Sequence, residues 1–411
     1  METYKIYKYR WIILAVYMYV QAINQVYCLN FAAVGSYIQE NMNISAMQIG
    51  SLVMAFNFVM VLLTIPVGLL IDRKGFKYCL GIGALFSGIF AMLRLVNPES
   101  YNWLLICQIG IGIGQPFIVN GVTKLAVTWF PQKEEATAVG LGTMALFLGM
   151  MIALGATPIM VETLGFQSMI LIYGILGAAG VLLVYVLVRA KPETPPGKIE
   201  VVEQISNWEG IKSILKIRNF VILGFITLIG SGFFIGFSSW LEMILNELHQ
   251  ISMVDAGTIG AVLMLSAIIG CVIVPMISDK IMKRKPFVLV ACAAGMVCMI
   301  LAIIANGYVM NMINIIILGF LLVSVLPILF TMATEMVGAR FAGISMAYLQ
   351  LLSQIAGIAV VFTVEALHGA TGSYVVPLAS LAILMIAGFV LATQLKETAR
   401  KQEVMTTDST A

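Results

Sequence analysis

Charged residues are scarce in this sequence. Only 10% of the 411 residues are Asp, Glu, Lys or Arg, whereas 61% are hydrophobic. A soluble globular domain carries about a quarter of charged residues, so this composition excludes a soluble protein. The net charge of +3 is small and spread along the chain, which gives no support to nucleic-acid binding.

Cysteine and histidine are scarce as well. The six cysteines fall inside apolar stretches without a C-x-x-C pair, a pattern that indicates neither a disulfide framework nor a zinc site. The two histidines, His249 and His368, are expected in short loops away from other metal ligands. The sequence has no nucleotide-binding loop and no nucleophile, base and acid that converge. We therefore expect no cofactor and no enzymatic activity.

What the sequence has instead is long apolar runs. About 20 residues of helix, at about 1.5 Å per residue, cross a hydrocarbon core of about 30 Å. The runs are continuously apolar, which excludes the alternating pattern of a β-barrel and predicts an all-α integral membrane protein. The first run is too long for a signal peptide, so we expect it to be retained. Twelve spans are predicted, at about 11–34, 47–70, 78–96, 102–129, 137–159, 167–188, 219–241, 254–278, 286–305, 309–336, 341–366 and 374–395.

Basic residues set the expected orientation. All but two of the 23 Lys and Arg residues fall in alternate connecting segments or at the two ends of the chain. Positive charge in short loops stays in the cytoplasm, so both termini are predicted to be cytoplasmic, in a plasma or bacterial inner membrane. The exceptions, Arg94 and Lys124, are expected near span ends, where long side chains reach the membrane surface.

The chain also divides into two halves. We expect a six-span bundle over 1–189, a cytoplasmic linker over 190–218, a second bundle over 219–397 and a disordered tail over 398–411. A Ser-x-x-Glu spacing at 206–209 predicts the start of an amphipathic surface helix within the linker, with an ordinary solvated linker as the alternative. The segments IPVGLLIDRKGFK and VPMISDKIMKRKP occupy matching places in the two halves, and parallel repeats of six spans are a transporter architecture.

The first of these segments reads Gly-x-Leu-x-Asp-Arg-x-Gly-x-Lys over 68–77 and resembles the signature loop of the major facilitator superfamily. The resemblance implies two pseudo-symmetric six-helix bundles and transport by alternating access. It also implies that Asp72 faces the positive end of the eleventh helix and holds one conformation closed, whereas the alternative is a loop that only fixes topology. The candidate gating residues are Gly68, Asp72, Arg73, Gly75, Asp279, Arg284 and Arg340.

The span centres carry amides, hydroxyls and aromatic rings in place of charges. Arg94, Lys124, Glu242, Glu335 and Glu365 are all expected near span ends, which disfavours anionic substrates because these need Arg or Lys. The alternative role for the amides is to join helices to one another. The candidate substrate-binding residues, chosen because they share helix faces, are Gln21, Asn24, Gln25, Gln115, Asn120, Trp240, Gln350 and Gln354.

A narrower resemblance covers QPFIVNGVTKLAVTWFP over 115–131 and the following EEATA, which are similar to the feline leukaemia virus subgroup C receptor family. Its members include choline and ethanolamine carriers and have been discussed as haem exporters. The resemblance implies that Gln115 and Gln354 face the substrate. It also shows a departure, because Gln25 and Ile235 stand where those carriers place the Trp and Tyr of a cation-π cage.

These observations predict a secondary or facilitative transporter for a small neutral or cationic organic solute. Its partners would be that solute and the lipid bilayer, with no nucleic acid, and we expect a monomer. Two alternatives stay open. One is a proton-coupled exporter of amphipathic cations that uses Glu242 or Glu365. The other is a membrane receptor or sensor that has the same fold and does not transport.

Overall fold

The computed structural model describes residues 6–42, 44–194, 207–305, 307–338 and 342–398, apart from a few side chains within the helices. The described residues contain helices and no strand. Twelve of their helical stretches are long and apolar enough to cross a membrane. The prediction of an all-α protein with twelve spans is therefore confirmed.

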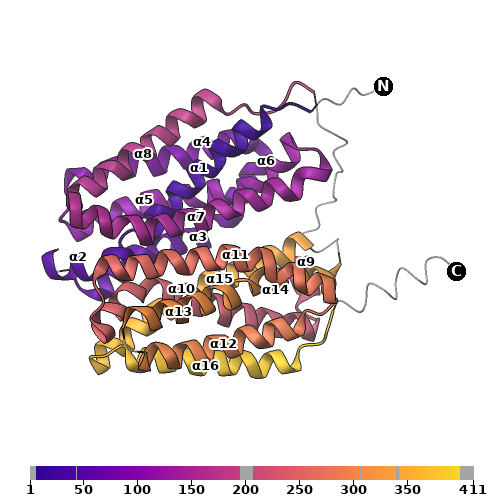
Figure 1. Cartoon of the computed structure of the whole chain (residues 1–411). Coiled ribbons are helices and arrows are strands. Elements are labelled where there is room, and N and C mark those ends of the chain that lie inside the picture. The colour runs from indigo at the N-terminus through magenta and orange to yellow at the C-terminus, as the bar shows by residue number, and fades with distance from the viewer. Residues whose placement is uncertain (1–5, 43, 195–206, 306, 339–341, 399–411) are drawn as a thin grey trace. The chain divides into compact units, whose positions relative to one another are not determined.

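The chain separates into two compact units, Met1–Val202 and Glu203–Ala411. Unit 1 contains six spans, of which the fourth consists of two helices in succession (Figure 1). Two short 3-10 turns, η1 (Ala32–Val34) and η2 (Arg94–Val96), follow the first and third spans. Its helices are α1 (Arg10–Leu29), α2 (Gly35–Met42), α3 (Ala46–Lys74), α4 (Phe76–Leu93), α5 (Tyr101–Val119), α6 (Gly121–Trp129), α7 (Gln132–Leu164) and α8 (Phe166–Leu187).

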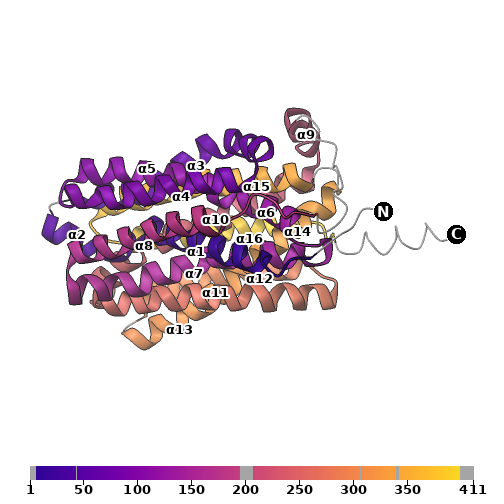
Figure 2. The same cartoon turned by 90° about the horizontal axis from the view of Figure 1, so that it is seen from above.

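Unit 2 begins with a short helix and continues with six spans (Figure 2). The span equivalent to the divided one of unit 1 is again interrupted, here by a π-helix, η3 (Gly319–Val323). The helices of unit 2 are α9 (Asn207–Ile214), α10 (Arg218–His249), α11 (Met253–Ile281), α12 (Lys285–Ile304), α13 (Tyr308–Leu318), α14 (Val325–Val337), α15 (Ala342–Thr371) and α16 (Val375–Gln394).

Local sequence explains where several helices begin. Ser45 caps α3, because its hydroxyl accepts from the backbone of Gln48 while the Gln48 side chain accepts from the backbone of Ser45. Ser100 and Ser252 cap α5 and α11 in a similar way. These caps stand at the end of each unit where the described residues include no exposed Lys or Arg. The end of each unit that carries Arg10 in unit 1 or Arg218 in unit 2 is called the basic end. The end with the serine caps is called the opposite end.

Glycines bring the helices of unit 1 into close contact. A Cβ added to Gly83 on α4 would lie 2.8 Å from the carbonyl oxygen of Gly114 on α5. A Cβ on Gly149 of α7 would lie 2.2 Å from the carbonyl oxygen of Ala22 on α1. Both distances are shorter than van der Waals contact, so only glycine at these positions lets the helix pairs pack this closely.

The linker helix α9 starts within one residue of its predicted position. Residues 195–206, which include the predicted cap, lie outside the described part of the chain. Ile214 is buried and Lys212 is exposed, so the helix has one apolar and one polar side. It packs against α15 of the same unit (Figure 2).

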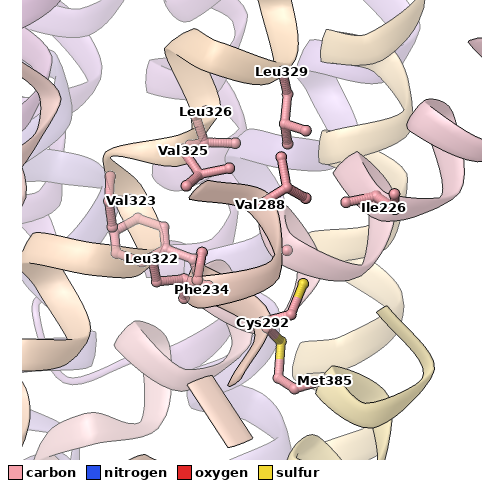
Figure 3. Close-up of a pocket in the computed structure, with 12 residues that line it drawn as sticks. Ile226, Phe234, Val288, Cys292, Leu322, Val323, Val325, Leu326, Leu329 and Met385 are labelled. Atoms are coloured by element: carbon pink, nitrogen blue, oxygen red, sulfur yellow. The ribbon is translucent and has the colours of Figure 1, made fainter. Parts of the chain in front are cut away.

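The fourth span of each unit departs from a regular helix. In unit 1, α5 ends at Val119 and α6 starts at Gly121, shortly after Pro116. In unit 2, the π-helix η3 precedes Pro327 and borders an apolar cavity of about 20 Å³ between α10, α12, α14 and α16 (Figure 3). The cavity is about the size of one water molecule, far below the roughly 300 Å³ of a ligand pocket. Discontinuous helices in matching positions of two repeats often mark substrate sites in transporters.

Candidate functional site

One face of α1 carries four polar side chains, and all of them are buried. Tyr17, Gln21, Asn24 and Gln25 have exposed fractions of 2% or less. The Tyr17 hydroxyl donates to Gln21 at 3.4 Å, and the Asn24 amide donates to Ser87 on α4 at 3.1 Å. Among the described residues, Oδ1 of Asn24 and Nε2 of Gln25 have no hydrogen-bond partner. The stripe therefore faces the interior and keeps two polar atoms available.

The amides of α5 fall into two classes. Gln108 is fully buried and donates to the carbonyl oxygens of Tyr27 at 3.3 Å and Leu52 at 3.1 Å, while its own oxygen accepts from Arg94. It therefore joins α1, α3 and α5, as an interhelical role requires. Gln115 is 6% exposed, and its Oε1 has no partner among the described residues.

Asn120 stands between α5 and α6. Its side-chain amide donates to the carbonyl oxygen of Thr64 on α3 at 3.3 Å, and its backbone N–H bonds to Pro116. The side chain is half-buried. Asn120 thus anchors the interruption of the fourth span to the neighbouring helix.

In unit 2 the candidate residues also differ in their contacts. Gln350 and Gln354 on α15 are half-buried, and Oε1 of Gln354 has no partner among the described residues. Trp240 on α10 is 1% exposed, and its indole N–H donates to the carbonyl oxygen of Val361 at 3.1 Å. Its ring lies beside that of Tyr374, with centroids 6.5 Å apart. The single donor of Trp240 is therefore already used inside the unit.

The candidate amides differ in whether their side-chain polar atoms already have hydrogen-bond partners. A buried polar atom without a partner costs about 1–3 kcal/mol, so such atoms are uncommon unless something else binds them. Gln21 and Asn120 are engaged within their unit. The candidates with hydrogen-bonding capacity left over are Asn24, Gln25, Gln115 and Gln354.

The first charged loop forms a tight turn. Gly75 ends α3 with a φ of 83°, a conformation that glycine adopts without strain, and α4 begins at the next residue. Gly68 lies within α3, and a Cβ placed there would meet no atom within 4 Å. Arg73 is exposed and makes no ion pair with a described side chain. The side chain of Asp72 and residue Arg340 lie outside the described part, so the role predicted for Asp72 stays a prediction.

The second charged loop contains a buried ionic cluster. The Arg284 guanidinium donates to Ser278 at 3.0 Å, to the carboxylate of Asp279, and to Glu335 on α14 at 3.2 Å. The Arg284 and Glu335 side chains are only 8% and 7% exposed, whereas that of Asp279 is 65% exposed. Burial lowers the pKa of Arg284, but the bonds to Asp279 and Glu335 outweigh it and raise this pKa.

The segment after α16 completes this cluster. The carboxylate of Glu397 accepts from the backbone N–H groups of Arg284 at 2.8 Å and Lys285 at 3.1 Å, at the start of α12. The Thr398 hydroxyl donates to Glu335. A carboxylate at this place satisfies free N–H groups and the positive end of the helix dipole. Sequence reasoning missed Glu397, because its partner Arg284 lies 113 residues away along the chain.

Arg94 lies near the end of its span, as expected, but its side chain is buried. It is 1% exposed, donates to Gln108, and lies over the rings of Tyr27 and Phe31 at 5.2 Å and 4.9 Å from their centroids. The expectation that it reaches the membrane surface is wrong. The 3-10 turn η2 follows α4 and holds the side chain inside unit 1, where two aromatic faces and an amide bind the guanidinium.

A second cluster of titratable side chains, around His368 and Glu247, lies at the opposite end of unit 2. His368 on α15 contacts Glu247 on α10 at 2.7 Å and stacks on Tyr374 at 4.1 Å, so the expectation of an isolated histidine is wrong. Glu365 is 7% exposed and its Oε2 has no partner among the described residues. Burial and then the nearby charges of Glu365, Glu247 and Glu242 raise the pKa of Tyr374.

Two units, each with six membrane-length helices and an interrupted fourth span, define a multi-pass transporter architecture. The sequence matches the Major Facilitator Superfamily over residues 11–361, and the chain belongs to this superfamily. Known structures agree. The chain is similar to a bacterial homologue of the human lysosomal transporter Spinster, in an inward-facing and unoccupied conformation, with a TM-score of 0.76 and 17% identity over 95% of this chain and 97% of that one.

Curated relatives point the same way. The choline/ethanolamine transporter FLVCR2 of Rattus norvegicus is 24% identical over 88% of this chain and 69% of its own length. The human FLVCR2 is also 24% identical, over 89% of this chain and 73% of its own length. An uncharacterized MFS-type transporter of Caenorhabditis elegans, C09D4.1, is 24% identical over 97% of this chain and 71% of its own length.

These likenesses establish the class of protein. The chain is a multi-pass membrane transporter, and its relatives imply a small-molecule solute. They point to a protein that transports without enzymatic chemistry. Neither a proton-coupled drug exporter nor a receptor without transport is favoured by them. The resemblance to the feline leukaemia virus subgroup C receptor family is confirmed.

Proposed function

We propose that this transporter carries a small organic solute, neutral or bearing an ammonium group, by alternating access and without a cofactor. The observation that carries the proposal is the set of buried amide oxygens without a partner among the described residues, namely those of Asn24, Gln115 and Gln354. Amide oxygens accept hydrogen bonds from an ammonium or a hydroxyl group and need no charged partner.

The relatives named as choline/ethanolamine transporters suggest which ammonium solutes to test. A primary ammonium has three N–H donors for amide oxygens, whereas a quaternary ammonium has none and depends on aromatic faces. In this chain Gln25 and Ile235 stand in place of the two rings of the cage that the resemblance implies. We therefore propose that ethanolamine-like solutes bind more tightly than choline.

The orientation and the membrane are part of the same proposal. All exposed Lys and Arg residues of the described spans and turns lie at the basic ends of the two units. We propose that these ends face the cytoplasm of a plasma or bacterial inner membrane. We also propose that the protein works as a monomer.

Uptake into liposomes tests the function. Purified protein would be reconstituted and supplied with radiolabelled ethanolamine or choline. Gln115→Leu removes an acceptor for the solute, and a loss of about 1–3 kcal/mol predicts uptake reduced roughly fivefold or more at low solute concentration. The matched control is Gln394→Leu, an exposed glutamine at the end of α16, which should leave uptake unchanged. Equal uptake by wild type and Gln115→Leu would contradict the proposal.

A further inference from the structure

A cleft of about 360 Å³ opens at the opposite end of unit 1. We call it the α2 cleft. Its volume falls in the range of about 300–1,000 Å³ that is typical of small-molecule sites. Three segments line it, namely α2, the turn between α4 and α5, and the junction of α7 with the first residues of α8. The lining residues used below are Tyr37, Asn41, Glu99, Phe166, Gln167 and Ser168.

An aromatic stack forms one wall of the α2 cleft. The Tyr37 ring stacks on Phe166 with centroids 6.1 Å apart and planes 22° apart. Phe166 in turn stacks on Phe31 at 6.3 Å, and Phe31 carries the Arg94 guanidinium at 4.9 Å. Phe166 is 7% exposed, whereas Tyr37 is half-buried. The stack is therefore fixed at its buried side and presents Tyr37 to the cleft. Aromatic faces of this kind attract cations.

The charge around the α2 cleft is negative. Glu99 is the charged residue of its lining, is exposed, and makes no ion pair with a described side chain. Glu40 on α2 and Glu162 near the end of α7 are also exposed at this end. Arg94 is the one basic residue among the described residues here, and it is buried. A surface with carboxylates and without exposed basic residues raises the local concentration of cations.

We propose that the α2 cleft is a binding site for small organic ammonium ions, held between the Glu99 carboxylate and the Tyr37 ring, which Phe166 supports from behind. The polar side chains of Asn41 and Gln167 would bind hydroxyl groups of such ions. This inference deepens the proposed function, on which the identity of the natural ligand rests. In this proposal the solute binds first in the α2 cleft and then moves to the buried amides.

Chemical labelling of a cysteine in the cleft tests the binding directly. Ser168→Cys would be treated with a trimethylammonium methanethiosulfonate and, separately, with a sulfonate methanethiosulfonate. We expect the cationic reagent to react about tenfold faster. Tetramethylammonium should then slow the labelling saturably, and Glu99→Gln should weaken this protection about threefold or more. The control is Gln39→Cys, an exposed position on α2 outside the lining, which should show neither protection nor its loss.

Uptake kinetics then separate this inference from the proposed function. In low-salt liposomes, Glu99→Gln should raise the KM for ethanolamine about threefold and leave kcat unchanged. If wild-type liposomes take up neither ethanolamine nor choline while tetramethylammonium still protects the introduced thiol of the variant Ser168→Cys, the proposed function fails and the site stands. If uptake is normal but protection is absent and Glu99→Gln keeps the wild-type KM, the site is wrong and the proposed function stands.

Discussion

The two units carry the same pattern at their basic ends, a proline followed by an aspartate and a basic cluster, yet the basic residues meet different surroundings. In unit 2, Arg284 is buried against Glu335 and Asp279, and Glu397 covers the start of the next helix. In unit 1, Arg73 is exposed. Among the described residues of unit 1, an ion pair at this end joins Arg10 on α1 to Glu134 on α7 at 2.9 Å, with side-chain exposed fractions of 10% and 38%. A repeated sequence pattern therefore predicts where charge lies, and the partners supplied by other helices decide what it does.

The largest expected effect comes from breaking the buried cluster. Arg284→Gln leaves the Glu335 carboxylate buried without its cation, a change that typically costs about 3–5 kcal/mol. We expect the thermal unfolding temperature of the purified protein to fall by several degrees. Arg284→Gln with Glu335→Gln should recover part of the loss, because neither charge is then left alone. Equal losses in the single and double variants would argue against a paired cluster.

The Glu397 carboxylate that caps α12 should contribute less to the free energy of unfolding than the buried cluster does. Glu397→Ala removes the acceptor for two backbone N–H groups at the start of the helix, and losing a helix cap costs about 0.5–2 kcal/mol. Thermal unfolding should therefore shift by less than in Arg284→Gln. A matched control is Glu193→Ala, a carboxylate just after α8 that makes no bond to a described residue. A shift as large in the control as in Glu397→Ala would contradict the capping role.

The effect of Asp72 concerns transport more than stability. A carboxylate at the positive end of a helix contributes about 0.3–1 kcal/mol and up to about 2 when partly buried. If Asp72 stabilises one conformation of the cycle by that amount, Asp72→Asn should lower the rate of uptake roughly twofold to thirtyfold with membrane insertion intact. Liposomes with equal amounts of each protein provide the measurement. Unchanged uptake would leave Asp72 with a topological role alone.

The smallest effect on thermal unfolding is expected when Arg73 is replaced. Exposed charges away from structural features usually change stability by less than about 0.5 kcal/mol. Arg73→Gln should therefore unfold close to the temperature of the wild type, in contrast to Arg284→Gln. If both variants lost the same stability, the distinction between the two charged loops would not hold.

Much of the fold could be predicted from the sequence because the bilayer dictates it. Backbone groups in hydrocarbon must bond within the chain, so each apolar run becomes helical, although the fourth and tenth runs are interrupted. Hydropathy reports the thickness of the membrane and not the length of the helix. For this reason the predicted seventh span at 219–241 falls short of α10, which continues through a polar turn to His249. The prediction for the first span, 11–34, missed that α1 ends at Leu29 and a 3-10 turn follows.

The candidate site could be predicted only in part. Helical spacing correctly indicated that the polar face of α1 is buried. It could not tell that Gln108 is satisfied by the backbone of Leu52 while Gln115 keeps a free oxygen, because those partners come from other helices. Nor could distance from a span end show that Arg94 folds inward. The pairing of Glu247 with His368 joins residues 121 positions apart, which no local pattern indicates.

Buried amide oxygens without a partner are proposed to bind the solute, and this binding can be measured. The most direct measurement is a titration of the purified protein with ethanolamine, followed by thermal unfolding, for wild type, Gln115→Leu and Gln394→Leu. Ligands that bind the folded state raise its unfolding temperature. We expect a saturable rise for wild type and Gln394→Leu, and a rise that needs roughly tenfold more ethanolamine for Gln115→Leu. The same concentration dependence in all three proteins would contradict it.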